Sequence, residues 1–190
     1  KLMKSFIMKS LTRRALEHAD AVLPVSEDLR QKIESFGIKL RRVFVTHNPV
    51  DTELFQPTTV KKSTTSSMVF AGRLEHFKGG LRTVNAFDKI DASRKGWNLT
   101  LIGDGPEENA IRTFIRDRGL EKNVRLMGRL TKSQIAEEFR KAAFFVFPSA
   151  HETFGITIAE AMSSGLPVIV GNATAPVEFV DSESGLLVPP

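Results

Sequence analysis

The chain has 190 residues, 41% of them hydrophobic and 26% charged, which suits a soluble globular protein of one or two domains. It contains no Cys, so disulfide bonds and thiolate chemistry are excluded. Its four His are scattered without zinc-ligand spacing, and no apolar run approaches the roughly 18 residues of a membrane span. A structural zinc site is therefore not expected, and we expect a cytoplasmic protein without a cofactor of its own. Because the chain begins with Lys rather than Met, we also expect it to be an excerpt from a longer protein.

The net charge of +5 is concentrated in the first third of the chain. Residues 1–67 carry twelve Lys and Arg against seven Asp and Glu, whereas residues 68–190 carry fifteen of each. A nucleic-acid-binding protein would carry its basic patch on the main folded body, so no nucleic-acid partner is expected. The basic N-terminal stretch has two interpretations. It is either the solvated face of a helix or a face for peripheral contact with anionic lipids or acidic partners.

The first part of the chain predicts two helices and two short strands. The helices are expected at residues 6–19 and after the N-cap Ser26, the second with Leu29 and Ile33 on its inner face and Gly37 at its end. The strands are expected at residues 21–25 and 42–46. Residues 56–67 contain one apolar residue in twelve, which is typical of a linker. We therefore expect a first domain at 1–57, a linker at 58–67 and a second domain at 68–190.

The second part alternates short, continuously apolar strands with helices. Strands are expected at residues 68–71, 99–102, 124–127, 143–147, 168–170 and 185–188. Helices are expected at residues 81–90, 106–118, 132–141 and 156–163. This alternation predicts an α/β fold, with a doubly wound, Rossmann-like parallel sheet covered on both faces. Ligands of such sheets bind beyond the carboxyl ends of the strands, so function is expected in the loops that follow them.

The loop after the first of these strands, residues 72–80, is rich in Gly and contains two cations. Arg73 can bind a phosphate with two hydrogen bonds, and Lys78 offers a compact charge, while Gly72 allows close approach of the backbone. The loop therefore suits a phosphate or a diphosphate. The alternative is a solvated loop in which these cations pair with Glu75.

Two further loops carry weaker signals. Residues 103–108 are typical of a tight turn with acidic side chains at a helix N-terminus, and their functional interpretation is only that they line the cleft. Arg129 and Leu130 follow another strand and could contact a base through their backbone.

The loop after the strand at 143–147 carries the strongest signal. Glu152 precedes a helix, and Glu160 lies inside that helix on a small, apolar stretch where a carboxylate needs definite hydrogen-bond donors, such as ribose hydroxyls. The first-turn amides of Gly155, Ile156 and Thr157 can hold an anion. The alternative is that Glu152 caps the helix and Glu160 faces solvent. No role is assigned to His151.

Five segments resemble one family, in its order, over about 150 residues. FPSAHETFGITIAEAMSSGLPVIVG, at residues 147–171, resembles the donor-site signature of retaining GT-B glycosyltransferases of family 4, with two Glu separated by seven residues. FAGRLEHFKGG, LIGDGPEE, HNPVDTELFQP and GLLVPP resemble four more of its motifs. The chain is thereby identified as the family's C-terminal donor-binding domain with a remnant of the N-terminal domain. GNATAPVE, at 171–178, departs from the family's pattern because it lacks a glycine pair.

The resemblance implies a role for each matching residue. Arg73 and Lys78 would hold the donor diphosphate and stabilise the leaving group, and Glu152 would act at the donor sugar. Glu160 would bind the ribose hydroxyls. The remaining donor contacts would come from Gly72, Arg129, Leu130 and the backbone of Phe154, Gly155, Ile156 and Thr157.

The implied function is retaining transfer of a hexose from a nucleotide sugar, without a metal. UDP-glucose, UDP-N-acetylglucosamine and GDP-mannose are all candidate donors, and the acceptor could be a glycan, a lipid or a small molecule. The resemblance places acceptor binding in the N-terminal domain, so the 190 residues alone are expected to be inactive. A second hypothesis is a nucleotide-sugar-binding domain that does not catalyse transfer, in a scaffold or regulatory subunit.

Overall fold

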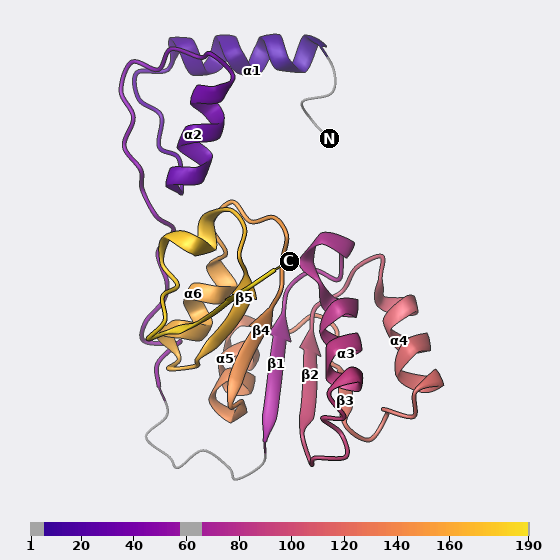
Figure 1. The fold of residues 1–190 in the computed structure, drawn as a ribbon. Coiled ribbons are helices and arrows are strands. Elements are labelled where there is room, and N and C mark those ends of the chain that lie inside the picture. Colours follow the sequence, from indigo (N-terminus) through magenta and orange to yellow (C-terminus); the bar gives the residue numbers. More distant parts are fainter. Residues whose placement is uncertain (1–5, 58–65, 190) are drawn as a thin grey trace. The chain divides into compact units, whose positions relative to one another are not determined.

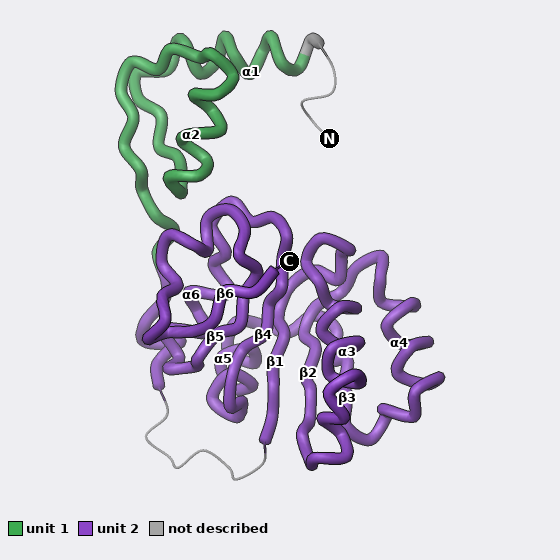
Figure 2. The backbone as a smooth tube through the Cα atoms, in the orientation of Figure 1, with its two compact units in different colours: residues 1–49 green, residues 50–190 purple. Residues whose placement is uncertain are grey.

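The computed structural model describes residues 6–57 and 66–189, and these form two compact units, residues 1–49 and 50–190 (Figure 2). The predicted linker lies mostly outside the described residues, which resume at Ser66. The domain boundaries predicted from the sequence therefore stay a prediction. Residues 50–57 belong to the second unit by their packing, since Phe55 is fully buried in its hydrophobic core.

The first unit contains the two predicted helices, α1 (Phe6–His18) and α2 (Glu27–Ser35). The Ser26 hydroxyl caps α2 by accepting a hydrogen bond from the Leu29 amide, and Gly37 follows its end with φ +69°. The strands predicted at 21–25 and 42–46 are wrong in extent. These segments run parallel but form a single bridge, between Val22 and Val43. Pro24 has no N–H to continue the ladder, and a two-stranded pair without further neighbours is marginal.

The second unit is a six-stranded, all-parallel sheet flanked by helices, as predicted (Figure 1). Its spatial strand order is β3-β2-β1-β4-β5-β6. The strands are β1 (Ser67–Ala71), β2 (Asn98–Ile102), β3 (Val124–Leu126), β4 (Phe144–Phe147), β5 (Val168–Gly171) and β6 (Gly185–Val188). The helices are η2 (His76–Lys78), α3 (Gly80–Lys89), α4 (Glu108–Asp117), α5 (Lys132–Lys141), α6 (Ile156–Ser163) and η3 (Ala175–Glu178).

Given this strand order, the placement of the helices follows from right-handed crossovers. From β1 the chain first moves outward through β2 to β3, and it then returns past β1 to β4, β5 and β6. Right-handed connections in opposite directions put the connecting helices on opposite faces. Accordingly α3 packs against α4, and α5 packs against α6. The chain order reverses between β1 and β4, which is the position where doubly wound sheets bind ligands.

The core is aromatic along the centre of the sheet. Phe70 and Phe147 lie with their ring centroids 5.2 Å apart, and Phe145 stacks on Phe147 at 5.7 Å. Phe139 of α5 meets Phe145 edge-on at 5.5 Å and contacts Phe55 at 6.0 Å. All five rings are at least 97% buried. This packing fixes β1 and β4 side by side, so the loops that follow them are held in a defined relation.

At the carboxyl edge of the sheet, the backbones of the loops after β1 and β2 pack closely against each other. Gly103, directly after β2, has φ +130°, and a Cβ built on it would lie 1.9 Å from the carbonyl oxygen of Gly72, directly after β1. The Leu74 amide then donates to the Asp104 carbonyl at 2.8 Å. The first two loops of the predicted site are thereby fastened to each other. In the part of the chain that the structure describes, no helix is long and apolar enough to cross a membrane.

Candidate functional site

A pocket of about 190 Å³ opens at the carboxyl edge of the sheet. It is formed by the last residues of β1 and β2, by residues that follow β1, β2 and β3, and by residues of α5 and α6. Its lining residues are Ala71, Gly72, Arg73, Ile102, Gly103, Asp104, Arg129, Leu130, Ile135, Thr157 and Glu160. The structure therefore brings six of the predicted donor-site residues together: Gly72, Arg73, Arg129, Leu130, Thr157 and Glu160.

Glu160 supplies a buried carboxylate to this pocket. It lies in the middle of α6 and is 6% exposed, so the alternative in which it faces solvent is wrong. Burial raises the pKa of the Glu160 carboxyl, and the ammonium of Lys132 acts in the opposite direction. The two groups are 3.4 Å apart, Lys132 being the first residue of α5 and largely exposed. A carboxylate in such surroundings is a strong acceptor for a pair of hydroxyl groups.

Two exposed cations border the same pocket, each beside a carboxylate. Arg73 Nε donates to Glu75 Oε1 at 2.9 Å, and Arg129 Nε lies 3.0 Å from Asp104 Oδ2. Both arginine side chains are more than half exposed, so an anionic ligand can replace the carboxylate partner at little cost. The pairing with Glu75 that the solvated-loop alternative predicts is present. It is compatible with phosphate binding.

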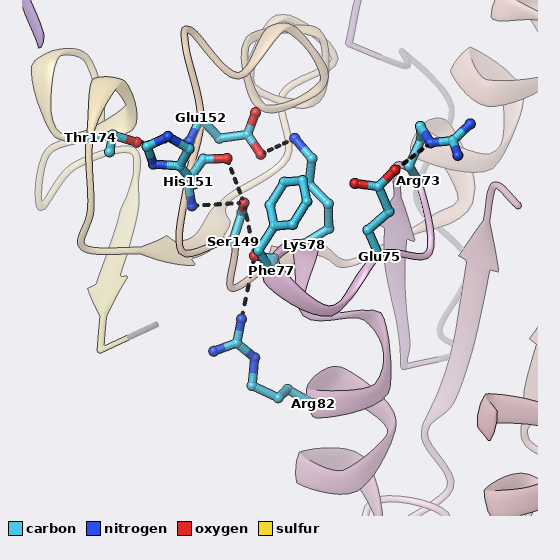
Figure 3. Close-up of polar contacts among 9 residues, drawn as sticks. All are labelled: Arg73, Glu75, Phe77, Lys78, Arg82, Ser149, His151, Glu152 and Thr174. Carbon is cyan, nitrogen blue, oxygen red and sulfur yellow. Dashed lines mark hydrogen bonds and ion pairs between the residues drawn. The ribbon is translucent and has the colours of Figure 1, made fainter. Parts of the chain in front are cut away.

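Lys78 and Glu152 form the second part of the site (Figure 3). Lys78 Nζ donates to Glu152 Oε1 at 2.7 Å, and both side chains are at most 21% exposed. The ammonium also lies 5.3 Å from the ring centroid of Phe77 and 5.8 Å from that of Phe147. Two aromatic faces and one carboxylate therefore hold the cation in a fixed place.

The N-terminus of α6 faces the same edge of the sheet. The helix begins at Ile156 with Gly155 as its N-cap, and none of the described side chains caps it. The alternative in which Glu152 caps this helix is therefore wrong, because that carboxylate is bonded to Lys78. The first amides of α6 have no partner within the helix and can receive an anion. Phe154 is 7% exposed and packs on Phe179 with 5.3 Å between ring centroids, so its ring anchors the loop.

Two residues that the sequence analysis did not single out contact the two predicted glutamates. Lys132 pairs with Glu160, and the Thr174 hydroxyl accepts a hydrogen bond from the Glu152 amide at 2.9 Å. The sequence could have indicated Lys132, because a cation in the first turn of a helix is unfavourable beside the positive end of the helix dipole. A lysine at that position therefore suggests a partner elsewhere in the fold. Thr174 has no such signal, because its loop departs from the family's pattern.

The described residues include no group of three or more His, Asp or Glu placed to hold a metal ion. The charged groups described at the site are two arginines and two lysines, each paired with a carboxylate, together with the N-terminus of α6. Fold and site together define a doubly wound α/β protein whose site suits a ligand with both an anionic group and hydroxyl groups.

Comparison with known proteins identifies the family. Residues 51–190 match the family described as glycosyl transferases group 1, and residues 1–54 match that described as glycosyltransferase family 4. The chain belongs to the glycosyl transferases group 1 family, and its second unit has the fold of GT-B glycosyltransferases, as the resemblance implies.

Individual relatives cover most of the chain. It is 31% identical over 175 residues to the exopolysaccharide phosphotransferase SCO2592 of Streptomyces coelicolor, covering 90% of the chain and 18% of that protein. It is 27% identical to the lipopolysaccharide 1,6-galactosyltransferase of Salmonella typhimurium, covering 81% of the chain and 43% of the relative. The chain thus spans less than half the length of these curated relatives. The structure of Anabaena HepE in complex with UDP and glucose has the same fold, with a TM-score of 0.83 and 20% identity over 97% of this chain and 53% of that one.

Proposed function

We propose that the protein transfers a hexose from a nucleotide sugar to an acceptor, with retention of anomeric configuration and without a metal ion. The observation that carries this proposal is the pocket that both the buried Glu160 and the exposed Arg73 line. A buried carboxylate that can accept from hydroxyl groups, in the same pocket as an exposed guanidinium that can bind an anion, is complementary to a ribose joined to a diphosphate.

The remaining groups then have roles in the transfer step. Cleavage of the bond between the sugar and the diphosphate leaves negative charge on the departing phosphate. Arg73, Lys78 and the first amides of α6 would stabilise that charge, which is the contribution that a metal makes in other enzymes. Glu152, beside Lys78 at 2.7 Å, would contact the sugar hydroxyls or the positive charge that develops at the anomeric carbon.

The comparisons support a nucleotide-sugar donor. HepE binds UDP and glucose, and a curated relative is named as a galactosyltransferase. UDP-glucose, UDP-N-acetylglucosamine and GDP-mannose remain the donors to test. The acceptor is a glycan, a lipid or a small molecule. Peripheral membrane contact through the basic N-terminal stretch also stays a prediction.

The nucleotide is identified by a thermal-shift panel of UDP, GDP and ADP with their sugars. A ligand at 100 times its dissociation constant stabilises the folded state by about 2.7 kcal/mol, which raises the Tm of a chain of this size by roughly 5–10 °C. The bound nucleotide is the one that gives this shift. No shift with any of them contradicts a nucleotide site.

A turnover measurement distinguishes the proposed transferase from the alternative, a binding domain without catalysis. The full-length protein is incubated with labelled nucleotide sugars, with and without a pool of glycan acceptors. A transferase releases nucleoside diphosphate faster when the acceptor is present and labels the acceptor. Stabilisation by the nucleotide sugar without any release of nucleoside diphosphate supports the binding domain instead. Proton NMR of the product at the anomeric centre tests retention.

A further inference from the structure

The geometry points to Thr174 as a positioning residue that holds the backbone of Glu152 for the transfer step, an inference that rests on the proposed function. The Glu152 amide donates to Thr174 Oγ1 at 2.9 Å, across 22 residues of sequence. The carboxylate of the same residue pairs with Lys78 (Figure 3). One residue of the predicted site is thus fixed through its backbone on one side and through its side chain on the other.

Thr174 has an unusual backbone conformation. Its φ is +58° and its ψ is −147°, a region that is populated almost entirely by glycine. In the described part of the chain, Asp91 is the other non-glycine residue with positive φ. A β-branched side chain is especially unfavourable there, so glycine would be the residue of least strain. A threonine in this position is explained by what its hydroxyl does.

The surroundings hold this strained conformation. Ala175 and Pro176 follow in η3 and are both buried, and the Val180 amide donates to the Pro176 carbonyl at 3.0 Å. On the preceding side, the Ala173 amide donates to the Gly171 carbonyl at 2.8 Å. The hydroxyl therefore projects from a segment that is anchored at both ends, as positioning requires.

The loop at 148–152 is fastened from two directions. On the Lys78 side, the carbonyl of Phe77 accepts from the Ala150 amide at 2.8 Å and from the Ser149 hydroxyl at 3.3 Å. On the Thr174 side, a Cβ built on Gly171 would lie 2.1 Å from the Ser149 carbonyl oxygen, so the backbones touch. The Thr174 hydroxyl extends this second contact to Glu152 itself. The loop carrying the carboxylate is thus held between the Lys78 turn and the segment after β5.

Three substitutions separate the hydroxyl from the shape of the side chain. Thr174→Ser keeps the acceptor, Thr174→Val keeps the β-branched shape without the acceptor, and Thr174→Gly removes both the acceptor and the strain. Thr113→Val, at an exposed position of α4, is the matched control for the same chemical change elsewhere.

The first measurement is hydrogen exchange of the Glu152 amide in the full-length protein, which does not depend on activity. We expect the amide to be protected in the wild type, in Thr174→Ser and in Thr113→Val, and to exchange at least about 10-fold faster in Thr174→Val. Equal protection in Thr174→Val and the wild type would overturn the inference. Folding of each variant is checked by its thermal transition.

The second measurement is turnover of the donor that the wild type uses among UDP-glucose, UDP-N-acetylglucosamine and GDP-mannose. We expect Thr174→Val to lower kcat about 10-fold with the dissociation constant for the nucleoside diphosphate unchanged within about 2-fold, and Thr174→Ser to restore kcat. An unchanged kcat in Thr174→Val, or equal losses in Val and Ser, would overturn the positioning role. If the wild type releases nucleoside diphosphate from none of these donors, the proposed function fails, and the exchange data then decide separately whether Thr174 holds Glu152.

Discussion

Lys78 and Glu152 lie 74 residues apart in the sequence, and their side chains meet at 2.7 Å. Lys78 lies in the turn after β1, and Glu152 lies in the loop after β4. These strands are neighbours, and the chain order of the sheet reverses between them. The ion pair therefore marks the position where a doubly wound sheet receives its ligand. It also couples the proposed diphosphate cation to the proposed sugar carboxylate.

Arg73→Ala and Lys78→Ala should each weaken binding of the cognate nucleoside diphosphate about 10- to 100-fold. A hydrogen bond to a charged group is worth about 1.5–3 kcal/mol, which corresponds to this range. Isothermal titration calorimetry at fixed ionic strength gives the dissociation constants. Arg112→Ala, which removes an exposed arginine paired with Glu108 on α4, is the control for lost positive charge and should bind normally. Normal binding by both site variants would remove them from the site.

Glu160→Gln should change how the stability of the folded state depends on pH. Burial raises the pKa of this carboxyl above its ordinary value of 4.5. Between that value and the raised one, the folded state binds more protons than the unfolded state, so stability falls as pH rises. Glutamine does not titrate, so the variant should lose this fall and be at least as stable as the wild type at pH 7. Urea denaturation at pH 4.5 to 7.5 measures both curves, and a variant that is less stable at pH 7 contradicts the expectation.

The same variant should lose affinity for the ribonucleotide. A carboxylate that accepts from ribose hydroxyls is worth about 10-fold or more in affinity over an amide of the same size. The matched probe is the 2′-deoxy nucleotide, which lacks one of these hydroxyls. We expect the wild type to discriminate between the two nucleotides and Glu160→Gln to discriminate much less. Equal discrimination by both proteins would show that the carboxylate does not contact the sugar.

Gly103→Ala should destabilise the second unit far more than Gly119→Ala. Both glycines have positive φ, +130° at Gly103 and +64° at Gly119, so alanine is strained at either position. At Gly119 a Cβ meets nothing within 4 Å, whereas at Gly103 it would lie 1.9 Å from a backbone oxygen. The two variants therefore differ in the clash between the loops after β1 and β2. In chemical denaturation, the free energy of unfolding of Gly103→Ala should be at least about 2 kcal/mol lower than that of Gly119→Ala. Equal free energies of unfolding would contradict the close packing.

The 190-residue chain alone should bind the nucleotide and transfer nothing at a useful rate. The family resemblance assigns donor binding to the second unit and acceptor binding to an N-terminal domain. Positioning of the acceptor can supply about 7–11 kcal/mol of barrier reduction, so its loss should nearly abolish transfer. The measurement compares this chain with the full-length protein on the same donor and acceptor. Comparable rates would mean that the whole catalytic machinery lies within these residues.

The sequence predicts the sheet well because its four central strands, β1, β2, β4 and β5, are largely buried. Continuous apolar runs such as residues 144–147 and 168–170 leave little choice of structure, and the helices at 132–141 and 156–163 match α5 and α6 in full. The first unit is harder to predict. Residues 21–25 and 42–46 have strand composition, yet Leu23 and Phe44 are more than half exposed, because no further strand among the described residues covers the pair.

The site is predictable where its chemistry conflicts with its local surroundings. Glu160 is identified by a carboxylate on an apolar stretch, and Arg73 and Lys78 by cations in a glycine-rich loop after a strand. Lys132 and Thr174 act across the fold through contacts 28 and 22 residues away in the sequence. Their partners depend on how α5 and the segment after β5 are placed. The position of Lys132 in the first turn of α5 indicates that it has a partner but not which one, and the residues around Thr174 indicate neither.

The position of β1 at the centre of the sheet has a consequence for synthesis on the ribosome. The N-terminus leaves the ribosome first, so β1, β2 and β3 can pair with one another before β4 has been made. During that interval the edge of β1 that later receives Phe144 and Phe145 is an open row of backbone donors and acceptors. Half-made chains should therefore be the species most prone to associate with each other or with chaperones, and a pause in translation before residue 144 should lower the yield of folded protein.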